Sequence, residues 1–558
     1  MSFFVDRLLE TAATVGQRNG VVTGEPTEPT HTTWAQVHEQ ARAIAGDLVA
    51  NGLAKHAAVA VLAAEPAAIG PAVQAVWLAG GSVTMLHQPT PRTDIAHWAE
   101  DTVRVLSMID SKLVLLGAPF EALAPVLDEH GIGYRLITSL GEGEPLAEVV
   151  EVDEDAPALL QLTSGSTAEP KAVRITHGNL WTNISAMAEK AELDVENDIM
   201  VSWLPMFHDM GMVGFYTTPM VIGVRLVKVT PVDFLSAPLL WAQLITKYRA
   251  TITAAPNFAY ALLGRRLGGA EDDAGYDLSS LRLALNGAEP IDEKAVRSFT
   301  EAGTRFKMAP ECVFPAYGMA EVTLAVSFVP LLTGLRLDHI DADKLEAQGR
   351  AVPVAPDQDG PETRAFALLG RPLPGIEAEV VDAEGNRLGE REVGEIRLRG
   401  AAVTPGYLTV NGPVPTQDAD GWLATGDIGY LVDGEIVICG RQKDVIILAG
   451  RNIYPTDVER AATSVDGVRA GNAVAVRLDA GSRRERFAVV VESRLAGDEA
   501  AERTLRKQVG ARVFEAINAR PSAVLVLPPG TLPKTPSGKL RRAAAGEQLA
   551  ASIQAREG

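Results

Sequence analysis

Small polar residues and one lysine crowd the stretch from Leu159 to Gly178, "LLQLTSGSTAEPKAVRITHG". Closely spaced glycine, serine and threonine can turn backbone N–H groups and hydroxyls toward phosphate oxygens, and Lys171 adds a cation. The stretch lacks the second glycine and the Lys-Ser/Thr pair of a Walker A loop. Its composition fits a polar surface loop equally well. Other segments must therefore decide between a plain loop and a phosphate site.

Four further segments follow this loop in order. They are "FPAYGMAE" (314–321), "LATGDIGYL" (423–431), "GRQKDVII" (440–447) and "LPKTPSGKLRR" (532–542). Five ordered motifs are far more specific than one, and together they resemble the acyl-adenylate-forming (AMP-forming) ligase superfamily over nearly the whole chain. The resemblance implies an α/β fold with a large N-terminal domain and a small mobile α+β C-terminal domain. It also implies that ATP activates a carboxylate to acyl-AMP and pyrophosphate.

A carboxylate and a polyphosphate are both anions, so their reaction needs cations and oriented hydrogen-bond donors. By the resemblance, the pyrophosphate end of ATP is held by Thr163, Ser164, Gly165, Ser166, Thr167 and Lys171. Glu321, together with Thr163, is implied to hold Mg²⁺ against the phosphates. The alternative for Glu321 is an ordinary acid at the start of a helix.

The resemblance also assigns residues to the adenosine part of ATP. The adenine wall is implied for Asn286, Gly287, Ala288 and Glu289, with Tyr317, Gly318 and Met319. Asp427 is implied to accept the ribose hydroxyls, and Arg441 to contact ribose or phosphate. A plain strand-to-turn junction and a plain turn aspartate are the alternatives.

Two lysines near the C-terminus complete the implied machinery. Lys539, in "PSGKLRR", matches the lysine whose ammonium would neutralise charge during adenylation. Lys443 falls where the family has its hinge, so the C-terminal domain would rotate there between two half-reactions. A solvated tail lysine and a surface lysine are the respective alternatives.

One segment bears on which acid is the substrate. It is "SWLPMFHDMGMVGFYTTPM", and it resembles the acyl-pocket segment of fatty-acid-activating members. Amino-acid-activating relatives place an acid after the phenylalanine, whereas Phe207 is followed here by His208, and Asp209 comes next. His208 is therefore assigned to the catalytic site, acting on a medium-chain or long-chain fatty acid. A simple core-lining segment is the alternative.

An insertion distinguishes branches of the superfamily, because 49 positions separate Glu321 from Gly370. The extra segment, about 331–361, and the motif "GRNIYPTDVE" resemble the fatty acyl-AMP ligases. That branch passes the acyl group to the phosphopantetheine thiol of an acyl carrier protein in polyketide or nonribosomal peptide pathways, and its insertion restrains the C-terminal domain. Docking an acidic carrier would need a positive patch, for which the candidates are Arg451, Arg460, Arg541 and Arg542.

Three alternatives remain open from the sequence. The insertion could be a tolerated surface loop, since loop lengthening costs little free energy. The chain could be a fatty acyl-CoA ligase that uses coenzyme A as acceptor. It could also be an adenylate-binding regulator without catalysis, because a fold does not guarantee an activity.

These motifs require an α/β framework, and the sequence predicts one. "HAAVAVLAAEPAAIGPAVQAVWLAGGSVTML" reads as a strand (58–63), a helix (66–78) and a strand (82–86), which is a βαβ unit with parallel strands. The pattern recurs near residues 103–117 and 239–256. From Gly375 alternating strands and turns predict a β-rich part, and a helix is expected at about 502–518. We expect an N-terminal domain 1–442, with the β-rich subdomain at about 370–442, and a C-terminal domain 443–558.

Composition limits the remaining classes. The 558 residues carry a formal charge of −20, which disfavours nucleic acid as a partner. Polar and glycine residues interrupt the uncharged stretch 66–91, so no integral membrane segment is expected. The two cysteines, Cys312 and Cys439, are too few for a disulfide framework, and the N-terminus has charges within its apolar residues. A cytoplasmic ligase is the expectation.

Overall fold

The structure is a computed structural model that describes residues 2–557 except 91–92, 164–168, 356–362, 449–450, 480–484 and 535–539, with backbone alone from 550 onward. The chain packs as two compact units. The first comprises Met1–Leu335, Gly370–Glu377 and Arg399–Leu423, and the second comprises Arg336–Leu369, Ala378–Leu398 and Ala424–Gly558. The second unit thus joins the C-terminal segment to the insertion and to most of the predicted β-rich subdomain. The boundary expected at 442/443 stays a prediction.

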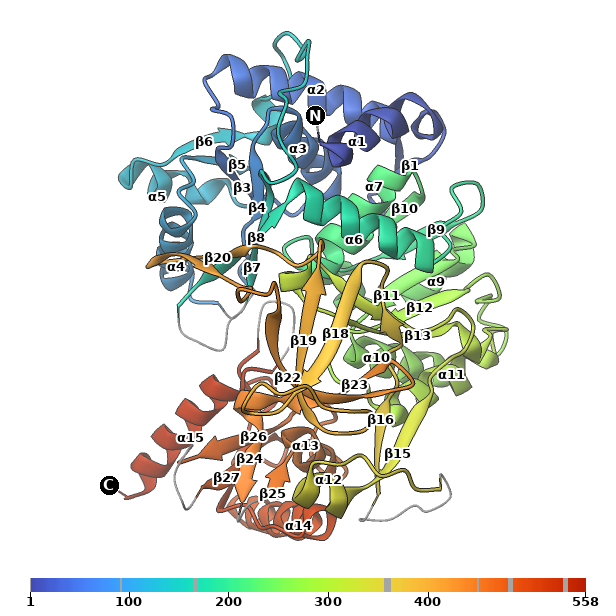
Figure 1. Cartoon of the computed structure of the whole chain (residues 1–558), viewed down its shortest axis with the longest axis vertical. Coiled ribbons are helices and arrows are strands. Elements are labelled where there is room, and N and C mark those ends of the chain that lie inside the picture. Colours follow the sequence, from blue (N-terminus) through green and yellow to red (C-terminus); the bar gives the residue numbers. More distant parts are fainter. Residues whose placement is uncertain are drawn as a thin grey trace. The chain divides into compact units, whose positions relative to one another are not determined.

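An eight-stranded sheet forms one half of the first unit, in the order β21-β20-β8-β7-β4-β3-β5-β6 (Figure 1). Its strands are β3 (Ala58–Leu62), β4 (Ser82–Met85), β5 (Leu113–Leu116), β6 (Gly133–Leu136), β7 (Pro157–Thr163), β8 (Lys171–Thr176), β20 (Gly406–Thr409) and β21 (Gly412–Pro415). From β7 to β6 the neighbours are parallel, whereas β8 and β20 pair antiparallel. The predicted βαβ unit is confirmed.

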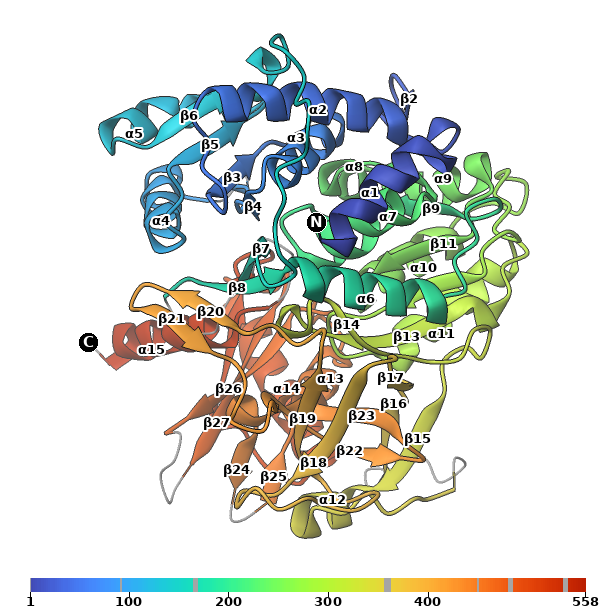
Figure 2. The same ribbon diagram turned by 45° about the horizontal axis from the view of Figure 1, so that its top comes forward.

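A nine-stranded sheet forms the other half, in the order β17-β14-β13-β12-β11-β9-β10-β1-β2 (Figure 2). Its strands are β1 (Gly20–Thr23), β2 (Thr30–Thr33), β9 (Ile199–Ser202), β10 (Arg225–Lys228), β11 (Ile252–Ala255), β12 (Leu283–Asn286), β13 (Val313–Gly318), β14 (Ala325–Phe328) and β17 (Arg371–Pro372). The five strands β10, β9, β11, β12 and β13 run parallel. Their carboxyl ends therefore share one edge.

Helices cover both sheets of the first unit. They are α1 (Phe3–Ala13), α2 (Trp34–Ala50), α3 (Pro66–Leu78), α4 (Ile95–Met108), α5 (Ala124–Glu129), α6 (His177–Lys190), α7 (Thr218–Ile222), α8 (Pro231–Ser236), α9 (Leu240–Tyr248), α10 (Asn257–Gly268) and α11 (Glu293–Thr304). α3 has the bounds that the sequence predicts: Pro66 occupies the first turn, and Gly80 follows its end with a φ of 76°. Most of its residues are buried, which explains the long uncharged stretch. Among the described helices, none is long and apolar enough to cross a membrane.

The second unit holds most of a four-stranded sheet with the order β18-β19-β22-β23. Its strands are β18 (Ile376–Val381), β19 (Gly394–Gly400), β22 (Leu423–Val432) and β23 (Glu435–Arg441). Asp433 and Gly434 join β22 to β23 with φ values of 51° and 75°, which is the twist that a two-residue hairpin prefers. The insertion expected at about 331–361 contains β15 (Leu337–Asp341) and α12 (Ala342–Gln348). β16 (Thr363–Ala367) pairs with β15 just beyond those bounds, so the inserted region extends to Ala367 in the structure. The β-rich character expected from Gly375 onward is confirmed.

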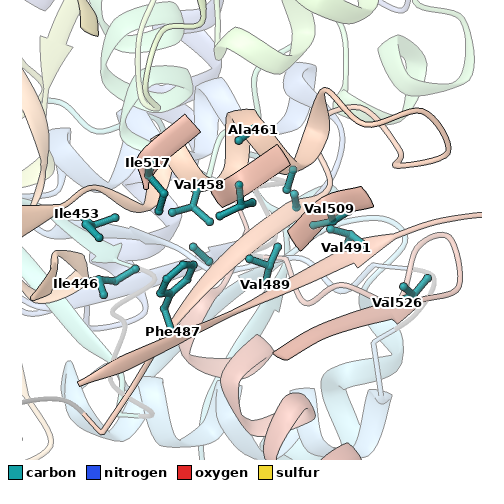
Figure 3. Packing of buried hydrophobic residues seen from close by; sticks show 14 of the residues in the cluster. Ile446, Ile453, Val458, Ala461, Phe487, Val489, Val491, Val509, Ile517 and Val526 are labelled. Carbon is teal, nitrogen blue, oxygen red and sulfur yellow. The ribbon is translucent and has the colours of Figure 1, made fainter. Parts of the chain in front are cut away.

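The C-terminal part of the second unit is an α+β layer built around the three-stranded sheet β26-β27-β28. Its elements are β24 (Ile446–Leu448), β25 (Arg451–Ile453), α13 (Pro455–Thr463), β26 (Ala473–Leu478), β27 (Arg486–Glu492), α14 (Glu499–Ile517), β28 (Ala523–Leu527) and α15 (Arg542–Glu557). Figure 3 shows Val458, Phe487, Val489, Val509 and Ile517 packed together in its core. The helix expected near 502–518 is confirmed as α14.

We predict that His177 makes the stability of the first unit depend on pH. His177 is fully buried at the start of α6, and its Nδ1 lies 3.0 Å from Ser2 Oγ. Burial, with a smaller effect of His56, lowers the pKa of His177 to about 4. The unfolded chain therefore binds a proton between about pH 6.5 and 4 that the folded chain does not, so stability falls as the pH falls.

Relative to His177→Gln, the wild-type protein should lose about 2 kcal/mol of unfolding free energy between pH 7 and pH 5, measured by urea denaturation. The exposed His130→Gln serves as the matched control and should follow the wild type. Equal pH dependence in wild type and His177→Gln would contradict the assignment.

Candidate active site

The carboxyl edge of the nine-stranded sheet gathers three of the predicted motifs. β9 ends at Ser202 before the acyl segment, β12 ends at Asn286 before Gly287, and β13 ends at Gly318 before Met319. Because these strands run parallel, the three loops begin at the same edge. Parallel α/β sheets bind their ligands at this edge. Topology thus brings together segments that are far apart in sequence.

Thr163 and Lys171 stand at the two ends of the predicted phosphate loop. They pair directly, as the last residue of β7 and the first of β8. Thr163 Oγ1 is buried and has no hydrogen-bond partner among the described residues. A buried hydroxyl without a partner is costly, so this oxygen fits an absent metal ion or phosphate group. The other residues predicted to hold phosphate lie outside the described residues: Ser164, Gly165, Ser166 and Thr167.

Lys171, Glu321 and Tyr407 form one contact cluster. Lys171 Nζ lies 3.6 Å from Glu321 Oε1 and 3.8 Å from the centroid of the Tyr407 ring. The Tyr407 hydroxyl donates a hydrogen bond of 2.7 Å to Glu321 Oε1. The Glu321 side chain is 13% exposed and that of Lys171 is 30% exposed. A cation and a carboxylate with limited water access are thus placed beside Thr163, the strand partner of Lys171.

Tyr407 was missed by sequence reasoning. It lies on β20, which pairs antiparallel with β8 so that Tyr407 faces Val173 and Thr409 faces Lys171. The register between two strands so distant in sequence leaves no local pattern. The surrounding segment, "TPGYLT", has no feature that would predict a contact between Tyr407 and Glu321.

The predicted adenine wall is held by a buried amide pair. Asn286 is fully buried, and its Nδ2 donates to Asn257 Oδ1 at 3.1 Å. Ala288 has a φ of 67°, so the chain turns sharply after β12. Glu289 Oε1 accepts from the Phe258 backbone N–H at 2.6 Å, which fixes the turn to α10. This network orders backbone groups that could read a base edge.

Tyr317, Gly318 and Met319 lie at the end of β13 beside this turn. Tyr317 OH lies 3.8 Å from Met319 Sδ. Gly287 and Gly318 both border other backbone: a Cβ at Gly287 would lie 3.1 Å from Ala316 O, and one at Gly318 would lie 2.3 Å from Leu324 O. A position without a side chain is therefore required at Gly318, whereas the fit at Gly287 is only tight.

The acyl segment is anchored from two sides. Gln161 Nε2, on β7, donates to Phe207 O at 3.0 Å, which ties the segment to the strand that ends at Thr163. His208 Nδ1 lies 2.6 Å from Asp209 Oδ1, and Asp209 also accepts from the Met210 backbone N–H at 2.7 Å. The imidazole of His208 is thus oriented by a carboxylate.

Lys228 is a second residue that sequence reasoning missed. It is 1% exposed at the end of β10, and its ammonium donates to Ser202 Oγ at 3.2 Å and to Leu204 O. Burial lowers its pKa to about 7. The sequence "RLVKVT" gives no sign that this lysine points inward, yet it fixes the start of the acyl segment.

The second unit contains the other predicted site residues that the structure describes. Asp427 and Arg441 are register partners on β22 and β23, and Arg441 Nε lies 3.0 Å from Asp427 Oδ1. Asp427 is 3% exposed, so its carboxylate is held in a fixed place. Lys443 lies in a short 3₁₀ turn, Gln442–Asp444, where its carbonyl accepts from Arg477 Nη1 at 3.3 Å. Lys539 lies outside the described residues.

We predict that Gly318→Ala lowers the stability of the first unit by about 1–3 kcal/mol, because the added methyl group collides with the backbone at Leu324. Gly268→Ala is the matched control, since a Cβ there meets nothing within 4 Å. Thermal and urea denaturation of both variants measure the difference. Equal stabilities of the two variants would contradict the close approach at Gly318.

Comparison with known proteins agrees with this geometry. The family model described as AMP-binding enzyme matches residues 9–408. A Mycobacterium tuberculosis protein, Rv1013, whose name calls it a ligase and states no substrate, is 54% identical over 97% of this chain and 99% of its own length. The medium-chain fatty acid [acyl-carrier-protein] ligase JamA of Moorena producens is 34% identical over 71% of this chain and 68% of its own.

The fold is also found among solved structures. A structure from a study of fatty acyl-adenylate ligases of E. coli and L. pneumophila superposes with a TM-score of 0.89 at 30% identity, covering 100% of this chain and 99% of the other. The expected fold class is thereby confirmed. With the family model spanning more than half of its residues, the chain belongs to the AMP-binding enzyme family and has the adenylate-forming ligase fold.

Proposed function

We propose that this protein uses ATP to activate a medium-chain or long-chain fatty acid and then transfers the acyl group to a carrier protein. In the first step a carboxylate oxygen attacks the α-phosphorus, the bond to the β-phosphate breaks, and pyrophosphate leaves. In the second step the phosphopantetheine sulfur attacks the acyl carbon, its proton is released to water, and AMP leaves. The single observation that carries the proposal is the Lys171–Glu321–Tyr407 cluster beside Thr163.

The chain's own residues fit Mg²⁺ and a polyphosphate at this cluster. Both described side-chain contacts of Glu321 use Oε1, and Thr163 Oγ1 has no described partner, so a hard cation finds oxygen donors here. Within the described residues no group of three or more His, Cys, Asp or Glu could hold a metal ion. That agrees with magnesium, which is usually held by one or two carboxylates together with substrate phosphates. Bound there, Mg²⁺ would neutralise phosphate charge.

The other residues keep the roles that the resemblance implies. Lys171 supplies a cation for the departing pyrophosphate. Tyr407, which the resemblance does not include, holds the Glu321 carboxylate in place. We further propose that Asp427 accepts the ribose hydroxyls, with Arg441 orienting that carboxylate. Lys539 and the hinge at Lys443 stay predictions of the same kind.

A fatty acid is supported by the character of the acyl segment. The residues Trp203, Leu204, Met206, Phe207, Met210 and Met212 are all buried, and His208 with Asp209 are its ionisable members. Apolar walls with a few polar groups suit a fatty acid better than an amino acid. FadD26 of Mycobacterium marinum, 33% identical over 73% of this chain and 75% of its own length, is named a long-chain fatty acid AMP ligase.

A carrier protein as acceptor is supported by the packing of the insertion. Ile340, Leu345 and Phe366 of this region share a buried cluster with Val445 and Tyr454 of the C-terminal segment. An inert surface loop would not contribute to such a core. The insertion is therefore built into the second unit, as the proposed restraint on the C-terminal segment requires. The carrier would belong to a polyketide or nonribosomal peptide pathway in the cytoplasm.

Ion pairs reinforce this packing. Arg364 Nε lies 2.9 Å from Asp457 Oδ2 on α13, and its Nη2 lies 3.4 Å from Glu346 Oε1 on α12. Arg451, the first residue of β25, donates to Glu346 as well. Glu346 is 4% exposed and Asp457 is 8% exposed. Burial raises the pKa of Glu346, while Arg451 acts in the opposite direction.

The same pairs narrow the candidates for a carrier-docking patch. Arg451 is engaged with Glu346, and Arg542 binds both Glu459 and Asp444 at 2.9 Å. Their charge is compensated within the second unit. Of the four arginines named from the sequence, Arg460 on α13 and Arg541 just before α15 are the exposed ones.

We predict that Glu321→Gln lowers fatty-acid-dependent pyrophosphate release by about 100-fold or more, because it removes the charge and keeps the shape. Tyr407→Phe should lower it by about 5- to 10-fold, since the ring below Lys171 remains and one hydrogen bond is lost. The surface variant Glu377→Gln, which touches only the Glu377–Arg399 pair, should match the wild type. Pyrophosphate release is measured for each variant with fatty acids of a series of chain lengths. Undiminished release by Glu321→Gln would overturn its assigned role.

We predict that Arg364→Met lets coenzyme A compete as acceptor, because it loosens the insertion from α13. Acyl-CoA formation should rise at least tenfold while pyrophosphate release stays within threefold of the wild type, which also shows that the variant folds. Arg350→Met, at an exposed pair with Glu392, is the control in the same insertion and should leave the acceptor unchanged. Rapid acyl-CoA formation by the wild type without acylation of a holo carrier protein would instead favour an acyl-CoA ligase.

A further inference from the structure

His87 stands at the same sheet edge as the phosphate loop. β4 and β7 are parallel neighbours with Val83 opposite Leu159, so the chain that leaves β4 toward His87 and the chain that leaves β7 after Thr163 start from the same edge. The chain stays in the sheet as far as Leu86, whose N–H donates to Val61 O at 3.0 Å. No motif of the sequence includes this histidine. Its backbone nevertheless leaves the sheet where the phosphate loop begins.

Two side chains fix the loop that carries His87. Trp98 Nε1, on α4, donates to His87 O at 2.9 Å. The neighbouring Gln88 donates through Nε2 to Ala63 O at 2.8 Å. The first hydrogen bond uses the backbone carbonyl of His87 and the second uses the side chain of Gln88. Neither bond involves the imidazole of His87. A residue whose backbone is fixed and whose ring nitrogens are not used to hold the loop is well suited to bind a ligand.

The ring of His87 reaches the acyl segment. It meets the Phe207 ring edge to face, with centroids 5.5 Å apart and planes at 72°. Phe207 is the residue whose carbonyl Gln161 holds, and His208 follows it. In the part of the chain that the structure describes, no hydrogen bond engages either ring nitrogen of His87. The imidazole therefore lies against Phe207 and near His208.

His87 is uncharged at neutral pH. Burial lowers its pKa to about 4, and the nearby His208 lowers it further in the same direction. The ionisable group of the acyl segment that acts on it is His208, which is itself paired with Asp209. A neutral imidazole always keeps one N–H donor and one acceptor nitrogen.

We propose that His87 binds the carboxylate of the acid substrate, where that carboxylate must approach the α-phosphate. This inference rests on the proposed function and adds a residue to the same site. A neutral donor suits the position, because it stabilises the carboxylate by hydrogen bonding without forming an ion pair that would weaken it as a nucleophile. The cations stay on the phosphate side, where Lys171 lies. His87 thus separates recognition of the acid from neutralisation of the phosphates.

The test compares His87→Phe, which keeps the ring against Phe207 and removes both nitrogens, with His87→Gln, which keeps a donor. For His87→Phe, kcat/KM for the fatty acid in pyrophosphate release should fall at least tenfold, while KM for ATP stays within twofold of the wild type. His87→Gln should recover activity to within about threefold. His97→Gln, exposed on α4, is the matched control and should equal the wild type.

Three outcomes would overturn an assignment, and they are distinguishable. A wild-type protein without fatty-acid-dependent pyrophosphate release would overturn the proposed function. An active wild type with an unchanged His87→Phe would overturn the role of His87 alone. Equal losses in His87→Phe and His87→Gln, with KM for ATP raised in both, would show that the ring only supports the fold.

Discussion

Parallel pairing of strands is the constraint on which the first unit depends. β9, β11, β12 and β13 point the same way, so the segments that leave them begin at one edge although they span more than one hundred positions of sequence. Side-chain chemistry at this edge follows from backbone hydrogen bonds made within the sheets. The antiparallel strands β8 and β20 then carry Lys171 and Tyr407 to Glu321.

The distribution of charge in the first unit follows the chemistry that the site must support. Lys171 and Glu321 are close together and only partly shielded from water, as their proposed exchange of partners with phosphate and metal requires. Lys228, in contrast, is buried among neutral oxygens and fixes the backbone of the acyl segment. These two lysines, one on each large sheet of the first unit, thus differ in burial and in partner.

A large part of this fold could be predicted from local patterns in the sequence. Helix α3 could be delimited because proline at its start and glycine after its end act within a few residues, and the Asp433–Gly434 turn carries its own signal. The site residues came from ordered motifs, which place Glu321 and Asp427 without any knowledge of their neighbours. Tyr407, Lys228 and His87 could not be found this way, because their roles depend on register between distant strands and on the direction of burial. The inserted region is rich in charged residues, yet Ile340, Leu345 and Phe366 suffice for a shared core.

The buried ion pairs of the insertion have an evolutionary consequence. Glu346, Arg364, Arg451 and Asp457 depend on one another, since removing one partner of a buried pair leaves an uncompensated charge that costs about 3–5 kcal/mol. A lineage could not discard this junction gradually without passing through poorly stable intermediates. Replacing all four together by apolar side chains avoids that barrier. The junction is therefore easy to keep and hard to lose by single substitutions, so the feature that couples the insertion to the C-terminal segment would tend to be inherited as a block.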